Sequence, residues 1–110
     1  AAGFTVVSRW IDFHGDSDDP DVLEQEAAND IEDLTKARLM IILNTRISEG
    51  KAVEQGIMIW RGGHIIGVGT PTCVFHHLSC YQWVPSVSAA IAAATLWQAG
   101  QEEDIDGEAD

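Results

Sequence analysis

Hydrophobic and polar positions divide the first third of the chain into an extended segment and a periodic one. Phe4–Phe13 is rich in β-branched and aromatic residues, which favours a strand that ends near His14 and Gly15. Asp19 and Pro20 are then typical of a helix start, with the Asp as cap and the Pro at the first helical position. Apolar residues follow at spacings of four, four and three, the single stripe of an amphipathic helix: Leu23, Ala27, Ile31 and Leu34.

The periodic pattern changes near Thr35–Ala37, where we expect the helix to give way to a strand. The run Leu39–Leu43 is apolar on every side, which is typical of a central strand, and Asn44–Ser48 continues with β-compatible residues. Since no Gly or Pro lies between Asp21 and Glu49, one long helix is the alternative interpretation of the same residues.

Glycines in the middle of the chain favour hairpins. Ser48–Lys51 indicates a tight turn around Gly50, followed by a strand over Ala52–Trp60. The pair Gly62-Gly63 lies between this strand and Ile65-Ile66, which is typical of a two-residue hairpin loop. Glycines inside the predicted strands indicate bulges or close backbone approach, namely Gly56, Gly67 and Gly69.

The last third of the chain predicts one more extended stretch and one helix. Pro71 ends the preceding strand, and Cys73–Val84 is interpreted as extended or hairpin-like. A final helix begins after Pro85, with Ser86 or Ser88 as its cap, and ends at Gly100. The resulting fold class is α+β, with the element order β-α-β-β-β-α, a mostly antiparallel sheet and two helices on one face.

Length supports a single domain. The 110 residues predict one α+β domain over 1–100 and an acidic, flexible C-terminal tail over 101–110. The longest apolar run, Ala89–Ala94, has six residues, against about 20 for a membrane-spanning helix, so the sequence predicts no membrane association and a cytoplasmic location.

Charge is the strongest global feature of the sequence. The net charge is −12, and residues 1–33 alone contain ten acids and one base. Direct contact with nucleic acid is disfavoured, because phosphate binding requires cationic side chains. A basic partner protein is favoured, since long-range attraction would speed the encounter. The carboxylates predicted to contact this partner are Asp21, Glu24, Glu26, Asp30, Glu32 and Asp33.

These acids favour a non-enzymatic binding protein. The sharpest hypothesis is an inhibitor that acts as a DNA mimic, presenting carboxylates where phosphates would sit in a partner's nucleic-acid-binding groove. Some phage proteins of the anti-CRISPR type use this strategy in the host cytoplasm, and the likeness is one of composition only. High acidity also suits solubility without any functional role. A structural or virion assembly subunit is the alternative.

Two cysteines flank two adjacent histidines in the pattern Cys73-x2-His76-His77-x2-Cys80. All four residue types are zinc ligands, so a small zinc or redox protein is a further alternative. Neighbouring side chains of a strand point to opposite faces, however, so one metal could hold both histidines only if the backbone turns there. A Cys73–Cys80 disulfide and two buried free thiols are the competing interpretations.

No motif supports catalysis, so the sequence predicts no enzyme, no catalytic residue and no cofactor. Neither a nucleophile elbow nor a phosphate-binding glycine loop is present. Four tryptophans in 110 residues are expected mostly in the core: Trp10, Trp60, Trp83 and Trp97. Any exposed one is a candidate interface residue, and a homodimer is compatible with this composition.

Overall fold

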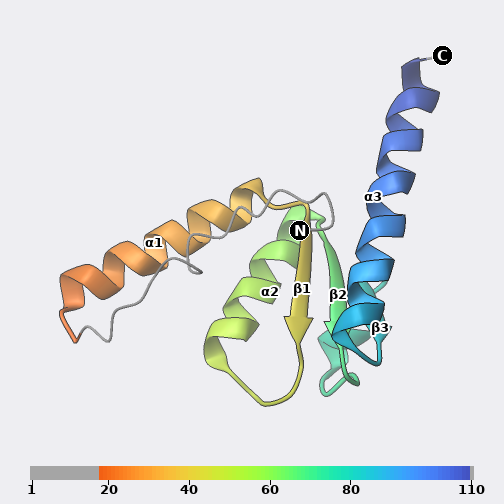
Figure 1. Ribbon diagram of the computed structural model, residues 1–110. Helices are drawn as coiled ribbons and strands as arrows, with labels where there is room; N and C mark the ends of the chain where they lie inside the picture. Colours follow the sequence, from red (N-terminus) through yellow and green to blue (C-terminus); the bar gives the residue numbers. More distant parts are fainter. Residues whose placement is uncertain (1–17, 110) are drawn as a thin grey trace.

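The computed structural model describes residues 18–109, with side chains described for residues 18–101 (Figure 1). The strand expected over Phe4–Phe13 lies outside the described residues. In chain order the elements are α1 (Pro20–Lys36), β1 (Leu39–Leu43), α2 (Glu49–Arg61), β2 (His64–Val68), the 3-10 turn η2 (Val74–His77), β3 (Tyr81–Val84) and α3 (Val87–Ala109).

The sheet is parallel throughout, so the expectation of a mostly antiparallel sheet is wrong. Its strand order is β1-β2-β3, with Leu39 opposite His64 and Ile65 opposite Tyr81. Parallel neighbours need a crossover connection, and α2 supplies it between β1 and β2. The described residues therefore form an α+β domain, as expected, but its three strands are parallel and do not form a meander.

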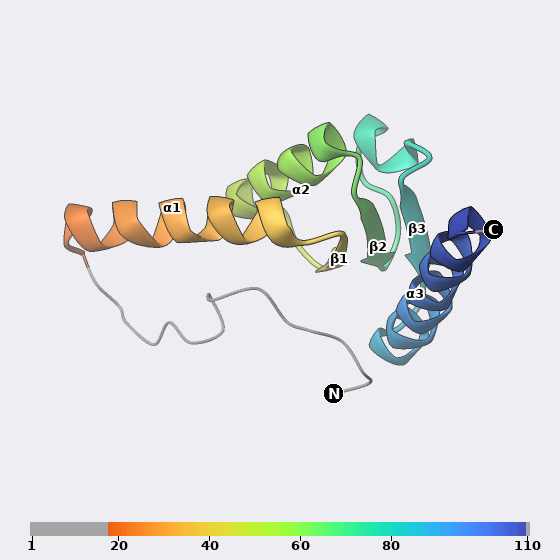
Figure 2. The same cartoon turned by 90° about the horizontal axis from the view of Figure 1, so that it is seen from above.

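Helices cover both faces of the sheet, and not one face as expected (Figure 2). On the α2 face, Met58 and Ile65 are fully buried. On the opposite face, α3 packs through Ala90 and Ala94 against Ile66, the next residue of β2. Because successive side chains of a strand point to opposite faces, β2 contributes to both cores and is the centre of the molecule.

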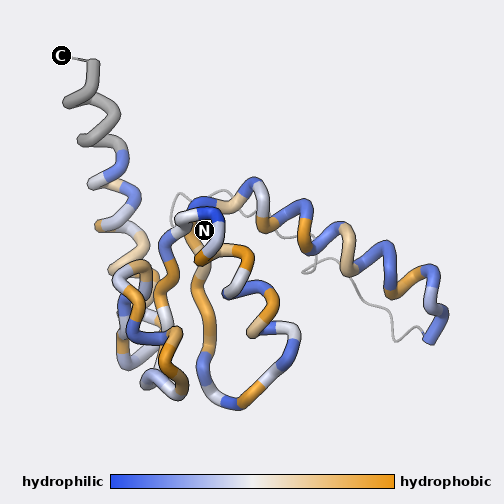
Figure 3. The backbone as a smooth tube through the Cα atoms, turned by 180° about the vertical axis from the view of Figure 1, so that it is seen from behind, coloured by the Kyte–Doolittle hydropathy of each residue, from blue (hydrophilic) through white to orange (hydrophobic). Residues whose placement is uncertain are grey.

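Helix α1 confirms the predicted start and stop signals. The Asp19 carboxylate accepts a hydrogen bond from the Asp21 N–H at 3.0 Å, Pro20 is at the first helical position, and the helix ends at Lys36. The helix-to-strand change near Thr35–Ala37 is thus confirmed. Figure 3 shows hydrophobic and hydrophilic residues alternating along α1, but Leu34 is the member of its apolar stripe that is buried.

The predicted turn at Ser48–Lys51 and the strand over Ala52–Trp60 are wrong, because these residues form α2. The Ser48 hydroxyl caps the helix by accepting from the Lys51 N–H at 3.3 Å. The predicted hairpin is a helix end: Gly62 has φ 77° and donates to Ile59 O, while Gly63 donates to Met58 O. A left-handed glycine serves a helix C-terminus as well as a hairpin, and here it serves the helix.

Strand β1 is confirmed, but it lies at an edge of the described sheet rather than in its centre. Ile41 and Leu43 face the α3 side and are 43% and 46% exposed, because α3 packs over β2 and β3 instead. Asn44–Ser48 does not extend the strand and forms a loop.

The C-terminal third contains both confirmed and corrected features. Ser86 caps α3 by accepting from the Ala89 N–H at 3.1 Å, as expected. Gly100 does not end the helix, which continues to Ala109. The stretch Cys73–Val84 is not one extended segment, because η2 precedes β3 within it.

Candidate functional site at the carboxyl edge of the sheet

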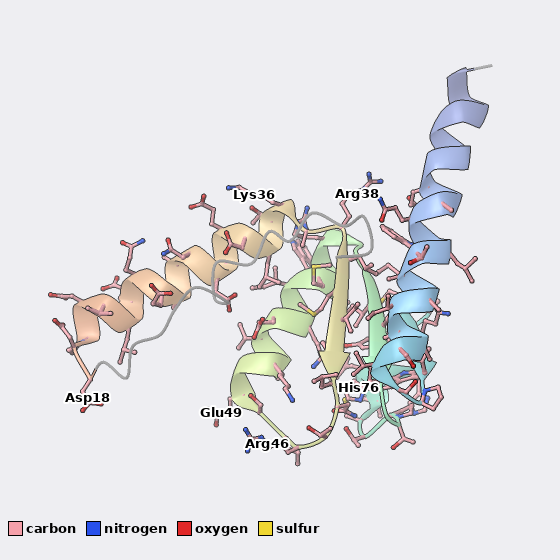
Figure 4. The ribbon with its side chains drawn as sticks, viewed as in Figure 1. Asp18, Lys36, Arg38, Arg46, Glu49 and His76 are labelled. Atoms are coloured by element: carbon pink, nitrogen blue, oxygen red, sulfur yellow. The ribbon has the colours of Figure 1, made fainter. Side chains whose placement is uncertain are left out.

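The carboxyl ends of the parallel strands meet at one edge of the sheet, where open α/β folds commonly bind their ligands. Strand β1 ends at Leu43, β2 at Val68 and β3 at Val84. Figure 4 shows Arg46, Glu49 and His76 near this edge, while Lys36 and Arg38 lie toward the opposite end of the strands. The carboxyl edge therefore gathers polar residues from loops that are far apart in the sequence.

An open pocket of about 410 Å³ lies between β1 and the first turns of α2. Its apolar wall is strand β1 from Met40 to Leu43, and its polar residues come from the loop after β1 and from α2: Thr45, Arg46, Lys51 and Glu54. The pocket thus combines four apolar lining residues with four polar ones, and convergent polar groups beside an apolar wall can orient a bound small molecule.

Lys51 fixes the polar end of this pocket to the strand. Its Nζ donates a hydrogen bond of 2.6 Å to the backbone carbonyl oxygen of Leu43, the last residue of β1. One turn further along α2, Glu54 lines the same pocket. The two side chains thus place an ammonium group and a carboxyl group beside the end of the strand.

Glu54 has an altered acidity. Burial raises the pKa of the Glu54 carboxyl above its ordinary value, the charge of Asp30 on α1 raises this pKa further, and Lys51 lowers it. Burial and the charge of Asp33 likewise raise the pKa of Asp30. A carboxyl group with a raised pKa in a pocket is a candidate proton donor or acceptor.

The loops at the carboxyl edge are tied to one another. The Asn44 side-chain amide, directly after β1, donates to Thr70 O at 2.7 Å and to Thr72 Oγ1 at 3.3 Å, both after β2. The Thr72 N–H in turn donates to His76 Nδ1 at 3.0 Å. These bonds hold the loops after β1 and β2 in one arrangement beside the pocket.

His76 is buried and its two ring nitrogens are occupied. Since Nδ1 accepts from Thr72, Nε2 carries the proton and donates to Gln55 Oε1 at 3.1 Å. The Tyr81 hydroxyl donates to the same oxygen at 2.7 Å. Burial lowers the pKa of His76, and the charge of His77 lowers it further. This network holds Gln55, and with it the adjacent Glu54, in a fixed position on α2.

The structure brings the carboxylates predicted for partner binding onto α1, but not all of them to its surface. Asp21, Glu24 and Glu32 are exposed, and Glu26 and Asp30 are half-buried. Asp33 is 3% exposed, so the expectation that this acid belongs to the outer surface is wrong. The reason is its place beside Leu34, where α1 packs against α2.

The Cys–His cluster is dispersed. Cys73 is exposed, Cys80 is half-buried, and both are free thiols. His77 is exposed, while both ring nitrogens of His76 are hydrogen-bonded within the protein. Among the described side chains, no group of three or more metal-ligating residues is close enough to hold a metal ion.

Lys51 and Glu54 were missed by the sequence analysis because their segment was interpreted as turn and strand. The available signal was Ser48, a good N-cap that follows a buried strand and a short polar loop. A strand, a loop and a capped helix together place the first turns of that helix at the carboxyl edge of a parallel sheet.

Comparisons with known protein families, with curated proteins and with solved structures give no match to this chain. No helix in the described part of the chain is long and apolar enough to cross a membrane.

Proposed function

We propose that the protein is an enzyme that binds a small polar molecule at the carboxyl edge of its sheet and uses Glu54 as a general acid–base. The observation that carries this proposal is the Glu54 carboxyl, which lines an open pocket and has a raised pKa. The proposal departs from the non-enzymatic protein expected from composition, since that expectation gave no role to α2.

Each part of the pocket supports a distinct task. The apolar wall of β1 packs against the less polar part of the ligand, and Arg46 orients an anionic or carbonyl oxygen. A carboxyl group with a raised pKa holds its proton at higher pH than an ordinary glutamate. It therefore donates this proton to a leaving oxygen or nitrogen and takes it back from the attacking nucleophile. Hydrolysis or group transfer at a polarised carbon or phosphorus is the reaction class that needs this exchange.

The test is consumption of a defined library of esters, amides, glycosides and phosphate esters, followed by mass spectrometry. The native protein is compared with Glu54→Gln and with Glu49→Gln, a control on the exposed first turn of the same helix. We expect the native protein and the control to consume at least one compound, and Glu54→Gln to be about 100-fold slower or worse. The absence of any consumption, or full activity of Glu54→Gln, contradicts the proposal.

A second candidate is the acidic binding protein expected from the sequence, acting on a basic partner in the cytoplasm. The exposed positions of Asp21, Glu24 and Glu32 on α1 favour it. Figure 2 shows that α1 extends beyond the sheet, which leaves this helix accessible to a partner.

Its test is a pull-down from host lysate at low and high salt, with a triple variant in which these three acids are replaced by Asn or Gln. Partners that bind the native protein at low salt, dissociate at high salt and do not bind the triple variant support this candidate. Partners that bind the variant equally well contradict it.

A further inference from the structure

The outward face of α2 is apolar and uncovered by the described residues. We define the outer α2 stripe as Ala52, Val53, Gly56, Ile57 and Trp60. Val53 is 59% exposed and Trp60 is 89% exposed, although tryptophan was expected mostly in the core. Ile57 is half-buried, and a Cβ added at Gly56 would meet no atom within 4 Å.

The inward face of the same helix packs through apolar side chains, apart from the buried Gln55, whose side-chain oxygen is hydrogen-bonded to His76 and Tyr81. Met58 is fully buried against the sheet, and Ile59 packs at the edge of the same core. A surface helix normally buries one apolar face and presents a polar one to water, whereas a helix that is apolar on both faces is typically buried. The outer α2 stripe thus has the composition of a covered surface.

We propose that the outer α2 stripe is the interface of a homodimer in which two α2 helices pack antiparallel across Gly56. Val53 precedes Gly56 by three residues and Trp60 follows it by four. A two-fold axis beside Gly56 therefore places Trp60 of each copy against Val53 of the other. A two-fold interface requires a surface patch that is complementary to itself about its own centre.

Glycine and charge both favour this arrangement. Without a Cβ at Gly56, the two helix backbones approach closely and each indole ring gains a flat surface to cover. The exposed Glu49 begins the helix and the exposed Arg61 ends it. Antiparallel packing brings the acidic end of each helix to the basic end of the other, which also opposes the two helix dipoles.

Arg61 keeps its place in the monomer while it serves this contact. Its Nη1 donates to Leu34 O at 2.6 Å and to Ala37 O at 2.7 Å, which anchors the end of α2 to the end of α1. Arginine has five N–H donors in a fixed fork, so the same guanidinium retains further donors for a carboxylate of the second copy.

The first experiment measures molar mass by light scattering from about 5 to 200 μM for the native chain, Trp60→Lys and Leu96→Lys. Leu96 is a matched control, because it is an apolar residue of α3 that is 75% exposed and lies outside the stripe. We expect the native chain and Leu96→Lys to dimerise in this range, and Trp60→Lys to dissociate at least about 30-fold more readily. Circular dichroism of Trp60→Lys should be unchanged, since this side chain is exposed in the monomer.

The second experiment places a thiol beside the expected two-fold axis. Gly56→Cys in a Cys73→Ser background should form a disulfide-linked dimer in air, whereas Leu96→Cys in the same background should not. A native chain that is monomeric at 200 μM overturns the proposal. So does a dimer that survives Trp60→Lys, because it must then use another surface, such as the outer edge of β1 in the described sheet.

Discussion

Lys51 Nζ lies 2.6 Å from the backbone carbonyl oxygen of Leu43 and donates a hydrogen bond to it. The bond joins the first turn of α2 to the last residue of β1, at the carboxyl edge of the sheet. The same ammonium group lowers the pKa of Glu54, against the effects of burial and Asp30. One side chain thus connects the local geometry of the fold to the acidity of the candidate catalytic group.

Replacing Lys51 by methionine should therefore change both properties. The variant keeps the length of the side chain but loses the charge and the hydrogen bond. We expect the pKa of Glu54 to rise further, and the free energy of unfolding to fall by about 1 kcal/mol. Carboxyl NMR titration measures the pKa, and urea denaturation measures the stability.

Lys36→Met is the matched control for this variant. Lys36 forms an exposed pair with Glu32 at 3.2 Å, at the C-terminal end of α1. Such surface pairs contribute between 0 and about 1 kcal/mol, and this one is remote from the pocket. A Lys36→Met variant that moves the Glu54 titration as much as Lys51→Met does would contradict the assignment.

Asp30 lies close enough to two other carboxyl groups, Asp33 on α1 and Glu54 on α2, to interact with their charges. Its replacement is therefore predicted to stabilise the protein. Burial and Asp33 raise the pKa of Asp30, so the folded state binds a proton more readily than the unfolded state does. The ionised Asp30 therefore costs stability above its folded pKa, and the cost disappears as the pH falls below its ordinary value of 3.8. Asp30→Asn should raise the melting temperature at pH 7 and leave it unchanged at pH 3. It should also lower the pKa of Glu54.

Asp21→Asn is the control for this effect, because Asp21 is exposed in the first turn of the same helix. There a negative charge is favoured by the helix dipole, so the substitution should be neutral or slightly destabilising at pH 7. Equal stabilisation by the two variants would mean that overall net charge, and not the local pair, is responsible.

His76 predicts a second pH dependence with the opposite sign. Burial and His77 lower the pKa of His76 below 6.5, so the unfolded state binds the proton more readily. Stability contributed by the neutral ring is present above the unfolded pKa and falls as the pH drops below about 6.5. Protonation would also break the bond that Nδ1 accepts from the Thr72 N–H.

His76→Gln should flatten this dependence between pH 7 and pH 5, at a cost of about 1–2 kcal/mol at pH 7. Urea denaturation across this range measures it. His77→Gln removes the neighbouring charge while leaving the buried network intact, so it should move the pKa of His76 upward. A wild-type stability that is flat from pH 7 to pH 5 would exclude this role for His76.

Local signals in the sequence predicted local structure, and they failed where one signal serves two structures. The Asp19–Pro20 start of α1 and the Ser86 cap of α3 follow from side-chain hydrogen bonds within one turn. Gly62 allows a positive φ, which both a hairpin loop and a helix C-terminus need. The hairpin interpretation reversed the direction of the following strand, and with it the class of the sheet.

The candidate site was hidden by the same error. A carboxyl edge exists because the strands are parallel, so no antiparallel interpretation could place Lys51 and Glu54 beside the end of β1. The raised pKa of Glu54 depends on Asp30, which lies 24 positions earlier in the chain and approaches only through the packing of α1 on α2. The raised pKa of Glu54 therefore follows from the tertiary structure and not from the composition.

Gly67, where the sequence predicted a bulge or close backbone approach, lies in an unbroken strand register against the Trp83 side chain, and it yields the last prediction. It lies opposite Trp83 in the parallel register of β2 and β3. A Cβ at this position would lie 2.4 Å from Trp83 Cζ3, so Gly67→Ala must displace an indole whose Nε1 donates to His76 O at 2.9 Å. We expect a loss of about 1–3 kcal/mol in the free energy of unfolding. Tryptophan fluorescence should also change.

Gly100→Ala is the matched control, because nothing lies within 4 Å of its added Cβ in the middle of α3. This variant should gain about 0.5–1 kcal/mol from the higher helix propensity of alanine. Equal stability changes in the two variants would show that Trp83 does not pack on Gly67.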